Sequence, residues 1–437
     1  MTTARKLFGT DGVRGEAGTF LSAELATALG RATTATLEAE RPQVLIVRDT
    51  RESGPMLEAA LAAGIAAAGG DALLGGVLPT PAAAILVQRL GLDLAAVVSA
   101  SHNPFHDNGI KFFNGRGTKL PDAVEAEIEA KIEEAPAAAH AGHVRELNGG
   151  LEDYLRELEK AFPLDLSGRK VVLDCANGAT YRAAPVIFER LGAEVELIGI
   201  EPDGRNINAG CGSTHIESLA ERVAASEAEI GFAFDGDGDR VLAVDGSGRT
   251  HDGDELIALA ARGMSQRGEL QGGVVVTVMS NFGFHQAMEE AGIEVAVTQV
   301  GDRYVIDEMQ RRGWSLGGEQ SGHIIASDFV STGDGIAAAL MTMRELGDAR
   351  LEQAVPMQKL PQILVNVEVA KREAVEGATA VWDAVKREDE ALDGRGRVLL
   401  RPSGTEPLVR VMAEAPTAEE AEAVCQRLVD VVRQELA

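Results

Sequence analysis

The chain has 437 residues, of which 45% are hydrophobic and only 4% aromatic, so we expect about three domains of roughly 150 residues with cores of Ala, Val, Leu and Ile. Acidic residues number 68 against 41 basic ones, and the formal net charge of −27 argues against nonspecific nucleic-acid binding and against docking on anionic membranes. The negative electrostatic field of such a protein would repel an anionic substrate, so binding one would need a local cluster of Arg and Lys.

The cysteines and the apolar segments indicate a compartment. Cys175, Cys211 and Cys425 are far apart and odd in number, which is typical of a reducing environment. The first residues lack the apolar segment of a secretory signal, and the longest uncharged stretch is short for a membrane span and interrupted by proline. We therefore expect a cytoplasmic protein without a membrane partner.

A buried strand, a helix and a second strand follow one another three times along the chain. The apolar runs that open these sets are typical of parallel sheets covered on both faces, and they lie at residues 44–50, 170–178 and 273–281. Later in each set a further strand ends in a polar loop, and we name these the serine loop (99–104), the aspartate loop (235–240) and the glutamate loop (317–323). Because ligands bind beyond the carboxyl ends of strands in open α/β sheets, we expect the three loops to line one cleft.

The pattern changes after about residue 363. An alternating strand, a helix at 379–392, two strands around a loop, and a final helix opened by a capping box of Thr417 and Glu420 predict a small α+β domain. The fold class is thus α/β, with three similar domains of mixed or parallel sheets and a smaller C-terminal α+β domain around a central cleft. The expected domain ranges are residues 1–152, 153–251, 252–363 and 364–437.

The aspartate loop, "DGDGDR", spaces three carboxylates at every second residue. In an extended segment this spacing puts Asp235, Asp237 and Asp239 on one face, and the glycines let the backbone bend around a small ion. Carboxylate oxygens favour hard cations, so Mg²⁺ is the expected guest. The alternative is a solvated acidic turn.

Residues 401–410, "RPSGTEPLVR", form what we name the anion loop. Ser403, Gly404 and Thr405 offer hydroxyls and unhindered backbone N–H groups between Arg401 and Arg410, which suits a phosphate. An ordinary Ser-Gly turn with surface arginines is the alternative.

The glutamate loop, "GGEQSGH", carries groups suited to a polyol. Glu319 and Ser321 alternate and would share a face, offering an acceptor and a hydroxyl. His323 follows them, and a lone histidine is more often structural than catalytic.

The serine loop, "SASHNP", presents Ser101 just after a buried strand. Two Asn-Gly pairs bracket "IKFF" at 110–113, as in a hairpin, and alternation turns Lys111 away from Ile110 and Phe112. No His–Asp pair is assembled locally to activate the hydroxyl as a nucleophile. With a metal site and a phosphate site elsewhere in the chain, we interpret Ser101 as the carrier of a phosphoryl group, with a plain polar turn as the alternative.

Seven motifs occur together in order: "FGTDGVRG" (8–15), "SASHNP" (99–104), "DGDGDR" (235–240), "VTVMSN" (276–281), "VGDRYV" (300–305), "GGEQSGH" (317–323) and "RPSGTEPLVRVM" (401–412). With these motifs the chain resembles the α-D-phosphohexomutase family over essentially its full length. Gln320 and the opening motif resemble the glucosamine branch of that family more than the phosphomannomutase/phosphoglucomutase branch.

The resemblance implies a role for each matched residue. Ser101 would be the phosphoserine, and one of its phosphoryl oxygens would join Asp235, Asp237 and Asp239 around Mg²⁺. Lys111, Arg14 and His323 would share acid and base work near the transferred group, and Arg240 would help to position it. Sugar hydroxyls would bind Glu319 and Ser321, and the phosphate that is not reacting would bind Arg401, Ser403, Gly404, Thr405 and Arg410.

The implied activity is the interconversion of glucosamine 6-phosphate and glucosamine 1-phosphate through glucosamine 1,6-bisphosphate, which feeds UDP-N-acetylglucosamine and cell-wall precursor synthesis. The expected partner is a small phosphosugar, without nucleic acid or membrane, and the expected assembly is a monomer or homodimer. The alternatives are the phosphomannomutase/phosphoglucomutase activity, a metal-dependent sugar phosphatase that uses Ser101 transiently, and a sugar-phosphate sensor with a vestigial site.

Overall fold

The computed structural model describes residues 7–9, 11–133, 138–370, 372–402 and 407–436. Its internal contacts divide the chain into two units: Met1–Met279 with Ile293–Val355, and Ser280–Gly292 with Pro356–Ala437. Among the described residues, no helix has both the length and the apolar character that crossing a bilayer requires.

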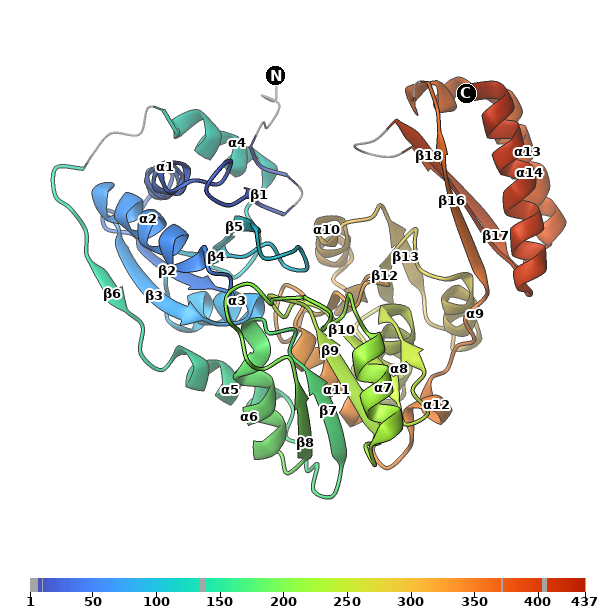
Figure 1. Ribbon diagram of the computed structural model, residues 1–437, viewed down its shortest axis with the longest axis horizontal. Helices are drawn as coiled ribbons and strands as arrows, with labels where there is room; N and C mark the ends of the chain where they lie inside the picture. Colours follow the sequence, from blue (N-terminus) through green and yellow to red (C-terminus); the bar gives the residue numbers. More distant parts are fainter. Residues whose placement is uncertain (1–6, 10, 134–137, 371, 403–406, 437) are drawn as a thin grey trace. The chain divides into compact units, whose positions relative to one another are not determined.

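The first sheet of the larger unit has six strands in the order β1-β5-β4-β2-β3-β6 (Figure 1). Its strands are β1 (Val13–Glu16), β2 (Gln43–Arg48), β3 (Asp71–Val77), β4 (Leu94–Val98), β5 (Asp107–Asn114) and β6 (Val144–Glu146). Its helices are α1 (Ala23–Thr34), α2 (Gly54–Ala67), α3 (Thr80–Arg89) and α4 (Asp122–Lys131).

Alternation along β5 decides where Lys111 points. Ile110 and Phe112 lie in the core that α1, α2 and α4 form over one face of the sheet. Because successive side chains of a strand point to opposite faces, Lys111 lies on the other face. The expected orientation of Lys111 is therefore confirmed.

The expected hairpin is wrong. Asn108 and Gly109 lie inside β5, which pairs with β4 on one side and β1 on the other, and only the second Asn-Gly pair opens a turn. The glycine serves a close approach instead, because a Cβ at Gly109 would lie 2.5 Å from the carbonyl oxygen of Ser99.

The second and third sheets of this unit follow along the chain. The second has the order β11-β10-β9-β7-β8, and the third β13-β12-β14-β15. The second sheet contains β7 (Lys170–Asp174), β8 (Glu194–Ile198), β9 (Ile230–Phe234), β10 (Val241–Asp245) and β11 (Thr250–His251), with α5 (Gly150–Ala161), α6 (Ala183–Arg190) and α7 (Glu217–Ala225). The third contains β12 (Val274–Thr277), β13 (Val295–Thr298), β14 (Leu316–Gly318) and β15 (Ile324–Ala326), with α8 (Gly253–Arg267), α10 (Asp302–Arg312), α11 (Gly335–Leu346) and α12 (Leu351–Ala354).

The three sheets repeat one topology. In each, the first strand lies between two parallel neighbours, and a fourth strand then pairs antiparallel with the third: β3-β2-β4-β5, β8-β7-β9-β10 and β13-β12-β14-β15. The connection from the third strand to the fourth carries the serine loop, the aspartate loop and the glutamate loop in turn. The predicted repeat is confirmed, and it puts the three loops in equivalent positions.

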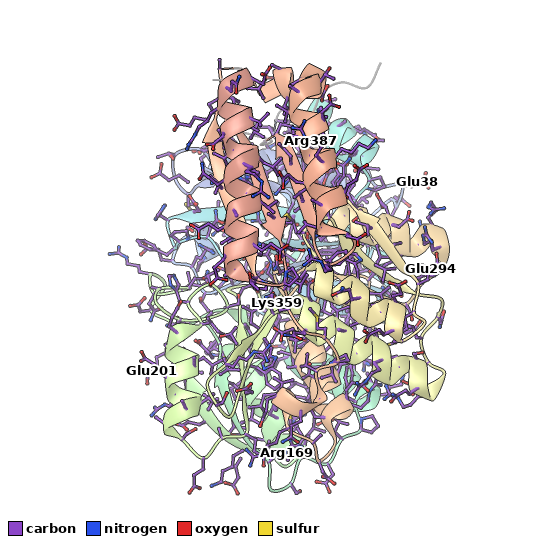
Figure 2. All side chains as sticks on the ribbon, turned by 90° about the vertical axis from the view of Figure 1, so that its right-hand side faces the viewer. Glu38, Arg169, Glu201, Glu294, Lys359 and Arg387 are labelled. Carbon is purple, nitrogen blue, oxygen red and sulfur yellow. The ribbon has the colours of Figure 1, made fainter. Side chains whose placement is uncertain are left out.

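The smaller unit contains an antiparallel sheet in the order β16-β18-β17, covered by two helices. Its elements are α9 (Phe282–Glu290), β16 (Gln362–Glu368), α13 (Thr379–Leu392), β17 (Arg397–Pro402), β18 (Leu408–Glu414) and α14 (Ala418–Leu436). Figure 2 shows α13, with Arg387 labelled, beside α14. Thr417 Oγ1 accepts the N–H of Glu420 over 3.2 Å, which is one half of the expected capping box.

Candidate active site

Ser101 lies just beyond β4 and is 1% exposed. Its backbone has the left-handed value φ = 51°, and its hydroxyl donates to Asp235 Oδ2 over 2.5 Å. Asp235 follows β9 of the second sheet, so the serine and aspartate loops meet although 134 residues separate the two side chains in sequence. The neighbouring His102 also reaches this hydroxyl, since its Nδ1 lies 3.3 Å from Ser101 Oγ.

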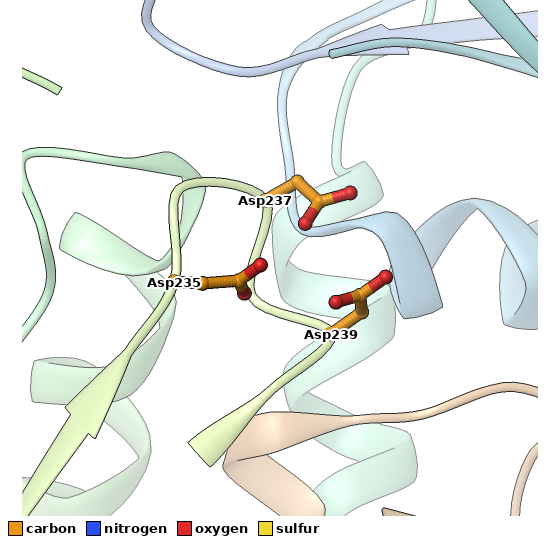
Figure 3. A group of neighbouring side chains, drawn as sticks. All are labelled: Asp235, Asp237 and Asp239. Carbon is orange, nitrogen blue, oxygen red and sulfur yellow. The ribbon is translucent and has the colours of Figure 1, made fainter. Parts of the chain in front are cut away.

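The aspartate loop gathers three buried carboxylates, and their ligand atoms lie within 4.8 Å of one another (Figure 3). They converge because the segment turns: Gly238 N donates to Asp235 O over 3.1 Å, and Gly238 has φ = 75°. The extended segment assumed from the spacing is therefore wrong, although the convergence itself was predicted. The left-handed glycine makes the turn possible.

This loop fits a hard divalent cation. Asp237 Oδ1 and Asp239 Oδ1 are buried and accept no hydrogen bond within the part of the chain that the structure describes. Buried carboxylate oxygens require a compensating partner, and Mg²⁺ takes such oxygens as ligands. The donor set therefore agrees with the metal site expected from the sequence.

Lys111 provides a positive charge beside the carboxylates of the aspartate loop. Its Nζ lies 2.7 Å from Asp237 Oδ2, 3.4 Å from Asp239 Oδ2 and 3.6 Å from Asp11 Oδ2. Burial by itself would lower the pKa of Lys111, but these carboxylates raise it above its usual value. The ammonium is therefore held in its charged form.

The carboxylates of the aspartate loop differ in their affinity for protons. Burial, with the charges of Asp239 and Asp237, raises the pKa of Asp235 well above its usual value. Burial acts in the same direction on Asp239, but Lys111 and His323 hold the pKa of Asp239 well below its usual value. Neighbouring carboxylates with pKa values driven apart are typical of functional sites.

Two arginines border the serine and aspartate loops. Arg240 Nη1 lies 3.1 Å from His102 Nδ1, and its backbone N–H donates to Asp235 Oδ1 over 3.2 Å. Arg14, on β1, pairs with Asp11, and its Nε donates to Asp11 O over 3.2 Å. Burial opposes the charge of Arg14, but Asp11, Asp237 and Asp239 raise its pKa. Arg14, Lys111 and Arg240 thus supply the local cations that an anionic substrate would need.

The glutamate loop is a tight turn between β14 and β15. Glu319 N donates to His323 O and Gly322 N donates to Glu319 O, each over 3.0 Å. Gly322 has φ = 90°, and a Cβ there would lie 2.2 Å from Val241 O, so only glycine fits. Glu319 Oε1 accepts the N–H of Gly301 over 3.0 Å, and Ser321 is exposed.

His323 joins this turn to the aspartate loop. Its Nδ1 lies 3.6 Å from Asp239 Oδ1, and its Nε2 accepts the N–H of Gly333 over 3.0 Å. An accepting Nε2 leaves the proton on Nδ1, which faces the carboxylate. All predicted site residues of the first three domains therefore lie on the three loops or on strands beside them.

The anion loop belongs to the smaller unit. Arg401 on β17 and Arg410 on β18 are register partners, and burial together with Arg410 lowers the pKa of Arg401. Ser403, Gly404 and Thr405 lie outside the described residues.

Two buried groups behind the serine loop are absent from the sequence-based prediction. Arg51 is 0% exposed and pairs with Asp49, Nε to Oδ2, over 2.8 Å. The available signal was their position directly after the apolar run of β2, at the edge where ligands bind.

Comparison with known families covers almost the whole chain. Four models described as phosphoglucomutase/phosphomannomutase match: alpha/beta/alpha domain I at 5–139, domain II at 152–248, domain III at 252–361 and the C-terminal domain at 364–431. The chain therefore belongs to the phosphoglucomutase/phosphomannomutase family.

Individual relatives span the same length. The chain is 52% identical to a phosphoglucosamine mutase of Desulforudis audaxviator (strain MP104C), covering 98% of this chain and 97% of the relative. It is also 52% identical to a phosphoglucosamine mutase of Moorella thermoacetica, covering 95% and 97%.

Solved structures share the fold. A phosphoglucomutase/phosphomannomutase family protein of Burkholderia thailandensis superposes with a TM-score of 0.84 at 24% identity, covering 98% of this chain and 97% of that one. An Aspergillus fumigatus N-acetylphosphoglucosamine mutase, solved with GlcNAc-6P and magnesium, has a TM-score of 0.69 at 18% identity, covering 99% and 96%.

Proposed function

We propose that this enzyme interconverts glucosamine 6-phosphate and glucosamine 1-phosphate, with Ser101 as the phosphoryl carrier and glucosamine 1,6-bisphosphate as the intermediate. The contact of 2.5 Å between Ser101 Oγ and Asp235 Oδ2 carries this conclusion, because it sets the hydroxyl of one domain against the carboxylate cluster of another. Relatives about 50% identical over nearly the full chain and named phosphoglucosamine mutase support the amino sugar as substrate.

In the first transfer the P–Oγ bond of phosphorylated Ser101 breaks and a bond from phosphorus to O1 of glucosamine 6-phosphate forms. The proton of O1 passes to a base of the site, for which His323 is the candidate, and Ser101 Oγ recovers a proton as the P–Oγ bond breaks. Lys111 and Arg14 are held in their charged forms, so their share of the acid and base work would be to donate to the departing oxygen and to the phosphoryl group. The bisphosphate then turns over, and O6 returns a phosphoryl group to the serine. Mg²⁺ held by Asp235, Asp237 and Asp239 would offset the charge of the phosphoryl group.

Positioning supplies much of the acceleration in such transfers. Arg240 would orient the phosphoryl group, and Glu319 with Ser321 would hold sugar hydroxyls. The phosphate that is not reacting would be bound by Arg401, Ser403, Gly404, Thr405 and Arg410, in the domain proposed at residues 364–437. A cytoplasmic location and a phosphosugar as the binding partner complete the proposal.

The test compares glucosamine, glucose and mannose phosphates as substrates, each with a trace of its 1,6-bisphosphate. We expect the glucosamine phosphates to give the highest kcat/KM, EDTA to abolish turnover and added Mg²⁺ to restore it. A preference for mannose or glucose phosphates would favour the other branch of the family. Release of inorganic phosphate as the main product, without need for a bisphosphate, would favour the phosphatase.

A further inference from the structure

Four buried residues form a closed ring of hydrogen bonds around the backbone of Ser101. On its amide side, Ser101 N donates to Ser99 Oγ over 3.0 Å, and Ser99 Oγ donates to Asp49 Oδ2 over 2.5 Å. On its carbonyl side, Ser101 O accepts from Arg51 Nη2 over 2.9 Å, and Arg51 Nε donates to Asp49 Oδ2 over 2.8 Å. Each of the four residues is at most 1% exposed.

Arg51 reaches beyond Ser101 and holds the rest of the serine loop. Its Nη2 also donates to Asn103 O over 2.9 Å, and its Nη1 donates to Asp107 O over 3.0 Å and to Pro104 O. With the bond to Asp49, all five N–H groups of the guanidinium are used. One rigid, charged fork therefore binds three carbonyls of the serine loop and the carbonyl of Asp107 at the start of β5, which a lysine could not do.

The serine loop needs such support because of its backbone. Ser101 has φ = 51°, a conformation that residues with a Cβ adopt rarely and that persists only where the surroundings impose it. Asn208, from the second domain, adds a bond from Nδ2 to Ser101 O over 3.0 Å. Gly236 of the aspartate loop packs against the same oxygen, since a Cβ there would lie 2.5 Å from it. A shift of this carbonyl would therefore move Ser101 Oγ away from Asp235.

We propose that Arg51, oriented by Asp49, is a positioning residue that holds Ser101 in the backbone conformation that presents its hydroxyl to the aspartate loop, and so sets the rate of phosphoryl transfer to and from this serine. The inference rests on the proposed function of Ser101. All N–H donors of the Arg51 side chain bind Asp49 or backbone carbonyls. Arg51 therefore affects the reaction through the conformation of the serine loop.

The test uses Arg51→Lys, which keeps a positive charge beside Asp49 but loses the fork. Intact-mass spectrometry follows the phosphorylation of Ser101 by glucosamine 1,6-bisphosphate, and steady-state assays give kcat and KM. We expect the phosphorylation rate and kcat to fall about 100-fold, as for a displacement of about 1 Å in a reacting group, and KM to change less than about threefold.

Arg169→Lys is the matched control. Arg169, labelled in Figure 2, also combines a carboxylate partner, Glu229 at 2.6 Å, with a backbone carbonyl, that of Gly347. None of its hydrogen bonds reaches the serine loop, so the control should keep wild-type rates.

A second variant separates positioning from loss of folding. In Arg51→Ala, guanidinium ion at millimolar concentration should restore part of the phosphorylation rate, whereas urea at the same concentration should not. Wild-type rates in Arg51→Lys, or no response of Arg51→Ala to guanidinium, would overturn the inference. If wild-type Ser101 accepts no phosphoryl group, the proposed function itself fails. If the wild type is phosphorylated and Arg51→Lys is phosphorylated equally fast, only the role of Arg51 fails, so the two failures are distinguishable.

Discussion

Replacing Lys111 with Met tests the charge balance of the active site. The change keeps most of the side-chain volume and removes an ammonium that lies 2.7, 3.4 and 3.6 Å from the carboxylates of Asp237, Asp239 and Asp11. Breaking a buried ion pair by removing one partner costs about 3–5 kcal/mol, because the other charge stays buried without compensation. At about 2–4 °C per kcal/mol, the metal-free variant should melt roughly 10 °C below the wild type.

Added Mg²⁺ should recover much of this loss, because a divalent cation replaces the missing charge at the same carboxylates. The assay is thermal unfolding of both proteins in EDTA and in Mg²⁺, with turnover measured in parallel. The shift produced by Mg²⁺ should be larger in the variant, and turnover should fall at least about 100-fold because a preorganised charge near the transferred group is lost.

The control is Lys131→Met, on α4. Lys131 pairs with Glu127 over 2.8 Å at the surface, its side chain is 33% exposed, and its Nζ also donates to Ala35 O over 2.9 Å. Such pairs contribute about 0–1 kcal/mol, so this variant should melt near the wild-type temperature. Equal melting of the wild type and Lys111→Met in EDTA, with equal shifts in Mg²⁺, would refute the reasoning.

Three further predictions follow from single contacts. Ser101→Ala should fold with near-native melting but turn over at least about 1,000-fold more slowly, and intact mass should show no phosphorylated fraction; wild-type turnover would contradict the carrier role. Gly322→Ala should lower the free energy of unfolding by about 2–4 kcal/mol and reduce activity, because the new Cβ would stand 2.2 Å from Val241 O at a left-handed φ; unchanged chemical denaturation would show that the turn relaxes. His251 Nδ1 lies 3.0 Å from Glu255 Oε1, and its Nε2 lies 2.8 Å from Asp245 Oδ2. Burial and the charge of Arg249 would lower the pKa of His251, but these carboxylates raise it above its usual value. Stability from a raised histidine pKa is fully present below the unfolded value of about 6.5 and is lost as pH rises through the folded pKa; melting temperatures from pH 6 to 9 should therefore fall more steeply for the wild type than for His251→Gln, and parallel slopes would contradict this.

Local patterns in the sequence were sufficient to predict most of the fold. Apolar β-branched runs marked β2, β7 and β12, and the helix expected at 379–392 coincides with α13. Strand and helix periodicities can be recognised within a few residues, so each run could be assigned from its own sequence. The repeated order of these runs then predicted three similar sheets. Alternation along β5 also oriented Lys111 correctly, since its neighbours had to face the core.

The same local patterns failed where distant segments approach one another. The pair Asn108-Gly109 looked like a turn, yet it lies in β5, which pairs with β1 and β4, and the nearby carbonyl of Ser99 is the reason that position 109 is glycine. The aspartate loop was expected to be extended, and its carboxylates converge through a turn at Gly238.

Partners across the sheets could be found only in the folded molecule. Nothing near residue 111 indicates that its ammonium meets Asp237, 126 residues away, or that the hydroxyl of Ser101 donates to Asp235. From the sequence Arg51 resembles a surface residue, because arginine is rarely fully buried. Only the folded molecule, in which β2 and β4 pair and their ends lie together, reveals five acceptors around it. Periodicity fixes which face a side chain takes, whereas its partners depend on how the domains fold together, and that information is distributed over the whole chain.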